Sequence, residues 1–238
     1  MPKALREKFK RELQALANSQ KAKFLQRYFK TGEGEYGEGD VFLGVTVPQT
    51  RIVAKKYFAM SLEELAQLLR SVIHEERLAA LLILVGQFKK ADKEKQTCVF
   101  DLYVNHRKWI NNWDLIDFSA PDIVGAYLQD KDKKILTTLA RSKSIWDRRI
   151  AILTTHYFIK QGKANDALHI AQILVDDEHD LIHKAVGWML REIGNYCGQD
   201  IEELFLKRYY KTMPRTMLRY AIEHFSKEKR VAYLKGRV

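Results

Sequence analysis

The sequence predicts an all-α protein of 238 residues, built as a stack of short helices. Apolar residues recur at helical spacing along most of the chain, and alternating strand-like runs are few. Only four prolines and twelve glycines interrupt the pattern. Many short amphipathic helices joined by tight turns favour stacked helical pairs, in which each pair buries its apolar face against its neighbours.

The helices are expected in the following order. Residues 3–17 place four apolar side chains on one helical face: Leu5, Phe9, Leu13 and Leu16. Ser61 and Glu64 form a capping box, which predicts that a helix begins at Ser61. Residues 77–88 are almost uniformly apolar, so we expect that helix to be buried on most sides. Further helices are expected over 98–108, 122–128, 131–141, 146–161, 164–175, 179–195, 201–210 and 215–225.

No linker rich in Pro, Gly or Ser divides the chain, so we expect one domain over residues 1–238. The helical segments show no crisp repeat at a fixed period. This favours a superhelical stack of degenerate HEAT-like repeats over a consensus array. A compact irregular helical bundle remains the alternative.

The irregular segment is residues 31–47, TGEGEYGEGDVFLGVTV. It contains a literal GxGxxG at Gly32–Gly37, but a dinucleotide site needs a strand before that motif and a helix directly after it. Here a helix is expected before it, and the acidic residues would repel a pyrophosphate. We interpret residues 32–40 as a flexible acidic loop. Residues 41–47 are then an extended lead into a helix that starts near Pro48.

The charge of the chain is strongly basic. Lys and Arg outnumber Asp and Glu by 41 to 30, which gives a net charge of +11 and a pI near 9.5. Such a balance in a globular chain indicates a polyanionic partner, although charge alone does not separate DNA from RNA or an anionic membrane. The N-terminus does not read as a signal peptide, and no apolar run is long enough to span a bilayer. With only Cys98 and Cys197, a soluble cytoplasmic protein is expected.

A metal site is not expected. His179 and His183 share one helical face, as two zinc ligands would, but no third ligand is evident downstream. His183 begins an apolar run, so a packed or surface histidine is the preferred interpretation. No Ser-His-Asp or Cys-His pairing is suggested by the local sequence.

The tryptophans are more informative, because charged or amide residues flank all four: Trp109, Trp113, Trp146 and Trp188. An isolated Trp most often fills a joint between helices. Here, however, Asp117 follows Trp113 at helical spacing. Further cations lie beside the later tryptophans, and aromatic rings interleaved with cations suit a nucleic-acid surface. These cations are Arg148, Arg149, Lys184 and Arg191.

At these residues the chain resembles the AlkD family of bacterial DNA alkylation repair glycosylases. The ordered motifs are QRYFK, LGVTVPQTR, WDLID, IWDRRIAIL, IHKAVGWMLREIG and TMPRTMLRYAIEHF, and the resemblance runs from about residue 3 to residue 225. It implies a superhelix of HEAT-like repeats with a basic concave groove for duplex DNA. It also implies a monomer without a metal or cofactor, which acts on DNA in the bacterial nucleoid.

The resemblance also implies roles for individual residues. Trp113 and Asp117 match a Trp and an Asp that lie beside the lesion, and Trp188 matches a second Trp that faces it. Arg149 matches an Arg that grips DNA next to the lesion, with Arg148 as an additional cation. Tyr28 matches the Tyr of the early RY motif. Lys184 and Arg191 flank Trp188 and are expected to contact DNA.

These roles fit the chemistry of removing a cationic N3- or N7-alkylated purine, whose glycosidic bond is already weakened. A carboxylate near C1′, here Asp117, stabilises the oxocarbenium-like sugar and orients the attacking water. Each indole, Trp113 or Trp188, offers a cation–π contact worth about 0.5–2 kcal/mol. The family reads the lesion from the backbone side rather than flipping the base into a deep pocket.

The chain departs from the family pattern at the acidic loop 32–40, at Asn112, where some members carry a second Trp, and at Asp147. Three hypotheses follow: a glycosylase for alkylated purines, a non-catalytic structure-selective DNA binder on the same scaffold, and a protein-interaction scaffold. The glycosylase is favoured by the presence of all four residues of the family site: Trp113, Asp117, Arg149 and Trp188.

Overall fold

The computed structural model describes residues 2–238, with side chains from Leu5 onward. The chain divides into two compact units, with the boundary in the sequence between Ser119 and Ala120. Each unit is described by itself. The helices of unit 1 (residues up to Ser119) are α1 (Pro2–Gln14), α2 (Ser19–Tyr28), α3 (Val47–Lys56), α4 (Leu62–Leu69), α5 (His74–Lys90), α6 (Lys93–His106), the 3₁₀ turn Arg107–Trp109 and α7 (Trp113–Ala120).

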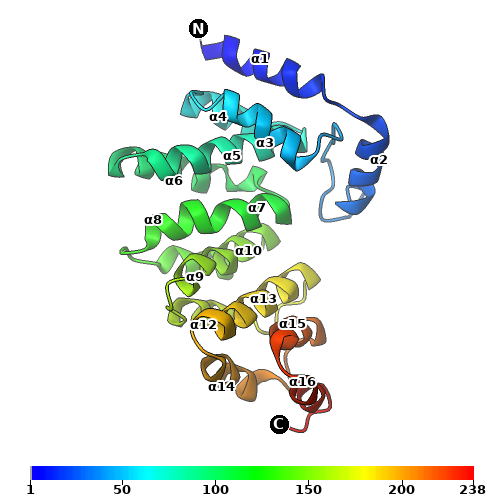
Figure 1. Ribbon diagram of the computed structural model, residues 1–238, viewed down its shortest axis with the longest axis vertical. Coiled ribbons are helices and arrows are strands. Elements are labelled where there is room, and N and C mark those ends of the chain that lie inside the picture. The colour runs from blue at the N-terminus through cyan, green and yellow to red at the C-terminus, as the bar shows by residue number, and fades with distance from the viewer. Residues whose placement is uncertain (1) are drawn as a thin grey trace. The chain divides into compact units, whose positions relative to one another are not determined.

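Helix α5 forms the centre of unit 1. Helices α3 and α4 pack on it, α6 packs on α4 and α5, and α1 packs on α3 and α4 (Figure 1). Most of α5 is buried, as its apolar sequence predicted, but burial extends to the charged first turn of residues 74–77. Buried charged groups need polar partners. The four residues of this turn form ion pairs or hydrogen bonds with α1, the 29–46 segment and α7.

The segment between α2 and α3 is non-helical and is held by side chains rather than by a sheet. The carboxylate of Glu75 accepts the backbone N–H groups of Leu43, Gly44 and Val45 at 3.0, 2.8 and 3.2 Å. A single parallel bridge joins Val41 to Ile73, the only strand-like pairing in the described residues. The segment is therefore fastened to the N-terminal end of α5.

Unit 2 (residues from Ala120 on) is also entirely helical. Its elements are the π-helical turn Pro121–Gly125, α8 (Ala126–Leu128), α9 (Lys134–Ala140), α10 (Ile145–Thr154), α11 (His156–Ile159), α12 (Asn165–Ile173), α13 (Asp180–Tyr196), α14 (Gln199–Tyr209), α15 (Arg215–Ala221), the 3₁₀ turn Ile222–His224 and α16 (Lys227–Leu234). Helix α10 packs between α9 and α13, and α13 also packs on α14 and α15 (Figure 1).

The all-α prediction is confirmed, because the described residues form stacked helices and no strand. The capping box of Ser61 and Glu64 is present at the start of α4, and α3 begins at Val47, one residue before the predicted Pro48. The predicted helix over 146–161 is divided at Thr155 into α10 and α11. None of the described helices is long and apolar enough to cross a membrane.

Candidate functional site

Trp113 is the first residue of α7, and its ring is held by an aromatic stack from α2 and the segment after it. The ring lies 5.3 Å from that of Phe29, at an interplanar angle of 20°. Tyr28 meets the same indole edge-on at 6.1 Å. Trp113 is half-buried, whereas Tyr28 is 55% exposed, so the pair presents aromatic surface to solvent on a rigid support.

A buried charge network lies behind this stack. Each ring nitrogen of His74 faces a carboxylate: Nδ1 is 3.1 Å from Asp40 and Nε2 is 2.8 Å from Asp114, the residue after Trp113. Both nitrogens donate only in the imidazolium form. Burial by itself lowers the pKa of His74, but Asp114 and Asp40 outweigh it, so the pKa lies above its usual 6.5. Arg77 adds a second cation, 2.6 Å from Asp40.

The His74 ring is itself part of the aromatic stack. It lies 4.5 Å from the ring of Phe42 and 5.1 Å from that of Phe29, which in turn stacks on Trp113. The network therefore contacts Trp113 by two routes, through the rings and through the α7 backbone at Asp114. We call these residues the Trp113 support: Phe29, Asp40, Phe42, His74, Arg77, Asn112 and Asp114.

Asn112 and the acidic loop belong to the same arrangement. The side chain of Asn112 is fully buried; its carbonyl accepts the N–H of Trp113 at 2.9 Å, and its amide donates to Asp40 at 3.4 Å. A Cβ on Gly37 would lie 2.4 Å from the carbonyl oxygen of Phe29 and 3.5 Å from the Asn112 amide. The loop over residues 32–40 thus ends at Asp40, within the Trp113 support. Asn112, where some family members carry a Trp, therefore has a structural role in this chain.

Asp117 lies four residues after Trp113 on α7, on the same helical face, and is half-buried. A hollow of about 390 Å³ adjoins the Trp113 support. Apolar side chains of α2 and the 41–47 segment line most of it. Its polar lining residues are Lys21, Thr46, His74, Glu75 and Asp114. Unit 1 therefore presents an indole, a carboxylate and an adjacent apolar hollow.

In unit 2, Trp188 lies on α13, half-buried. Its indole N–H donates to the Glu192 carboxylate at 3.0 Å, and its ring is 5.6 Å from that of His156. Burial, and to a lesser extent Lys160, lowers the pKa of His156, which favours a neutral ring beside the indole. Sequence reasoning selected Trp188 but missed His156.

The predicted DNA-binding cations of unit 2 are engaged within the protein. Arg148 pairs with Asp177 at 2.6 Å and donates to two backbone carbonyls. Arg149 is only 5% exposed and donates to the Leu181 carbonyl at 2.5 Å. Lys184 pairs with Asp180 at 2.6 Å, and Arg191 pairs with Glu223. Their DNA contacts stay predictions, and each would require a phosphate to compete with an existing partner.

The His179–His183 pair is used locally. His179 accepts the N–H of Leu181 at 3.1 Å and so caps α13, while His183 contacts the Asp177 carbonyl. Among the residues with described side chains, no group of three or more potential ligands could hold a metal ion.

The chain belongs to the DNA alkylation repair enzyme family, whose model matches residues 9–225. Membership indicates an enzyme of DNA alkylation repair, with DNA as its substrate. Among solved structures, the fold is similar to that of a predicted DNA alkylation repair enzyme from Enterococcus faecalis, with a TM-score of 0.70 and 17% sequence identity. The alignment covers 89% of this chain and 97% of that one. No curated protein matches the chain by sequence.

Proposed function

We propose that this protein is a monofunctional DNA glycosylase of the AlkD type, built from HEAT-like repeats, which removes N3- and N7-alkylated purines from duplex DNA in base excision repair. The observation that carries the proposal is the placement of Asp117 one helical turn after the rigidly supported Trp113. Residues 1–238 are proposed to act as one DNA-binding domain and as a monomer, at the bacterial nucleoid.

The proposed reaction breaks the bond between C1′ and the purine. Its electron pair moves to the base, which neutralises the positive charge of the alkylated ring, and the base leaves. Water adds to C1′, and its proton passes to Asp117 or to solvent. The Asp117 carboxylate stabilises the positive charge that develops on the sugar, and the indole faces of Trp113 and Trp188 attract cationic groups.

The test is single-turnover release of methylated purine from alkylated duplex DNA, at saturating protein. Asp117→Asn should lower the rate on the order of 100-fold, because one electrostatic contact to a developing charge is removed. The matched control is Asp101→Asn, on the exposed surface of α6, which should release base at the wild-type rate. An Asp117→Asn variant as fast as the control would refute the assigned role of Asp117.

The buried position of Arg149 favours the alternative, a non-catalytic structure-selective DNA binder on the same scaffold. The residue expected to grip DNA beside a lesion is instead directed to the Leu181 carbonyl. On this alternative, purified wild-type protein binds duplex DNA with a salt-dependent affinity but releases no base.

A further inference from the structure

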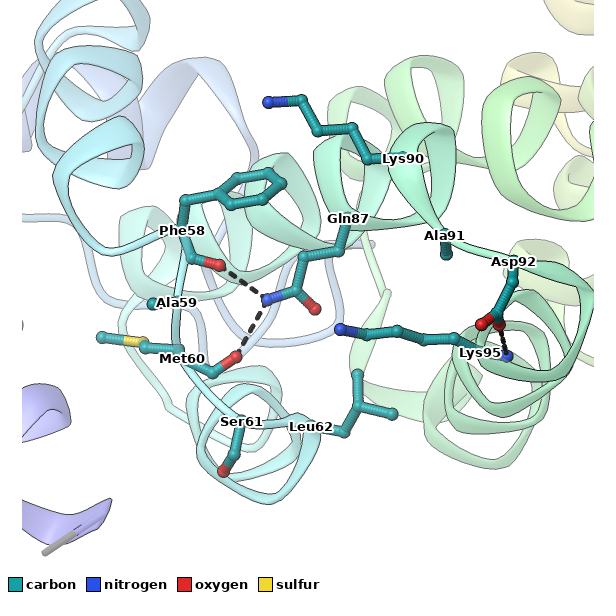
Figure 2. Close-up of a pocket in the computed structure, with 10 residues that line it drawn as sticks. All are labelled: Phe58, Ala59, Met60, Ser61, Leu62, Gln87, Lys90, Ala91, Asp92 and Lys95. Atoms are coloured by element: carbon teal, nitrogen blue, oxygen red, sulfur yellow. Dashed lines mark hydrogen bonds between the residues drawn. The ribbon is translucent and has the colours of Figure 1, made fainter.

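Two neighbouring hollows lie on unit 1 where α3, α4, α5 and α6 meet. Their volumes are about 420 and 580 Å³, and Phe58 and Lys90 contribute to both linings. Figure 2 shows the first, between the α3–α4 turn and the start of α6. We call the cations that line the two hollows the α3–α5 cationic patch: Arg51, Lys55, Lys90 and Lys95.

The cations of this patch are exposed and carry unneutralised charge. In the part of the chain that the structure describes, none of the four forms an ion pair, in contrast to Arg148, Lys184 and Arg191. Asp92 is the only acidic residue lining the hollows, and it accepts the N–H of Lys95 at 2.9 Å as the cap of α6. Clustered unpaired cations favour the approach of a polyanion.

The floor beneath these cations is a fixed surface. The Gln87 amide donates to the carbonyls of Phe58 and Met60 at 2.8 and 2.9 Å, which holds the α3–α4 turn against α5 (Figure 2). Gly86 leaves room for the Phe58 ring, because a Cβ there would lie 2.9 Å from the ring. The hollows are therefore built into the packing of α3 on α5.

The Phe58 ring already has contacts within the protein. One edge meets α5 at Gly86, and the ammonium of Lys90 lies 4.8 Å from the ring centroid. Apolar side chains of α5, Leu82 and Ile83, line the second hollow beside Arg51 and Lys55. Cations around a shallow apolar floor suit phosphates and sugar faces better than base edges, so recognition here should be independent of sequence.

We propose that the α3–α5 cationic patch binds the sugar-phosphate backbone of DNA. The proposal deepens the proposed function, on which it rests for its choice of DNA as the polyanion. It assigns phosphate contacts to cations of unit 1 that no motif resemblance selected.

The test is binding of undamaged, fluorescently labelled duplex DNA by the full chain across a salt series. The variant is R51Q/K55Q/K90Q/K95Q. Each phosphate contact makes the slope of log K against log salt more negative by about 0.9. In the variant the slope should therefore be shallower than in wild type, by about 2–4. Affinity at 0.1 M salt should then fall at least about 100-fold.

The matched control is K8Q/K163Q/K207Q/K235Q, which removes the same charge from exposed cations elsewhere that form no described ion pair. Its slope should change by less than about 1. A charge-conserving variant, R51K/K55R/K90R/K95R, should bind like wild type, and thermal unfolding confirms that all variants fold. If R51Q/K55Q/K90Q/K95Q has the same slope as the control variant, the proposal is overturned. A patch that binds an acidic protein instead of DNA would give this result.

Base release separates this proposal from the proposed function. If wild type releases no base while the patch variant still loses salt-dependent binding, the glycosylase proposal fails and the patch proposal stands.

Discussion

At the scale of single residues, the position of Trp113 depends on charged side chains that lie far from it in the sequence. Trp113 and Asp117 could be selected as a pair because helical spacing and the WDLID motif mark them. Their support could not, because Asp40 and His74 are far apart in sequence and meet only when the 29–46 segment folds onto α5. The one available indication was the charged stretch HEER at residues 74–77, where the apolar helix begins.

His74→Gln should lower the free energy of unfolding by about 3–5 kcal/mol, because it leaves the buried Asp40 and the half-buried Asp114 without their shared cation. The raised pKa of His74 sets the pH dependence. Its stabilising contribution is complete below pH 6.5 and is lost as the pH rises through the higher folded-state pKa. Urea unfolding of both proteins between pH 5.5 and 9 measures this. A stability difference that grows with pH would contradict the assigned charge state.

Glu202 in unit 2 is a second buried acid. Burial, with a contribution from Glu203, raises the pKa of Glu202 to about 8, and its Oε1 has no hydrogen-bond partner in the described structure. Folding therefore favours the protonated form, and this stabilisation is lost between pH 4.5 and about 8.

Glu202→Gln should match wild type below pH 4.5 and become progressively more stable above it, by at most about 5 kcal/mol at pH 9. Thermal unfolding across this range tests the prediction. The control is Glu178→Gln, which removes an exposed carboxylate of the same unit and should follow the wild-type stability profile at high pH. Equal pH profiles for wild type and Glu202→Gln would exclude the raised pKa.

At the scale of elements, helices with strong caps or long apolar faces were predictable from sequence, and the weakly buried ones were not. Helix α4 begins at its capping box, and α5 and α13 lie where the apolar periodicity placed them. Helix α2 buries no residue fully and α16 buries only Tyr233, so neither has a clear apolar face. Helix α2 was expected before the acidic loop but without defined ends, and α16 was missed. Helix α7 was too short for its periodicity to define its ends.

The 41–47 segment should depend on Gly44. This residue has a φ of +80°, and a Cβ would lie 2.1 Å from the Asn18 carbonyl oxygen at the start of α2. Gly44→Ala should therefore destabilise the protein by roughly 3 kcal/mol or more, because backbone strain and a backbone clash add. The control is Gly34→Ala, with a φ of +73° but no atom within 4 Å of the added Cβ. Its cost should be only about 1–2 kcal/mol. If Gly44→Ala and Gly34→Ala had equal melting temperatures, the close approach of Gly44 to the Asn18 carbonyl would not be maintained in solution.

At the scale of the whole molecule, the net charge of +11 predicted a polyanionic partner, and family membership identifies DNA. The sequence could not predict how that charge is distributed. Three of the four cations selected beside the tryptophans are held by Asp177, Asp180 and Glu223, and the fourth donates to a backbone carbonyl. The unpaired cations of the α3–α5 cationic patch belong to no motif. Side-chain pairing depends on which helices become neighbours, and composition carries no information on that.

The central claim, that the protein hydrolyses the glycosidic bond of cationic purines, is tested most directly by product analysis. Duplex DNA carrying N3-methyladenine or N7-methylguanine is incubated with excess wild-type protein, and the products are separated by mass. Hydrolysis should yield free methylated base together with an equal amount of abasic DNA whose backbone stays uncut until alkali is added. Recovery of intact alkylated DNA, bound by the protein but not hydrolysed, would contradict this claim.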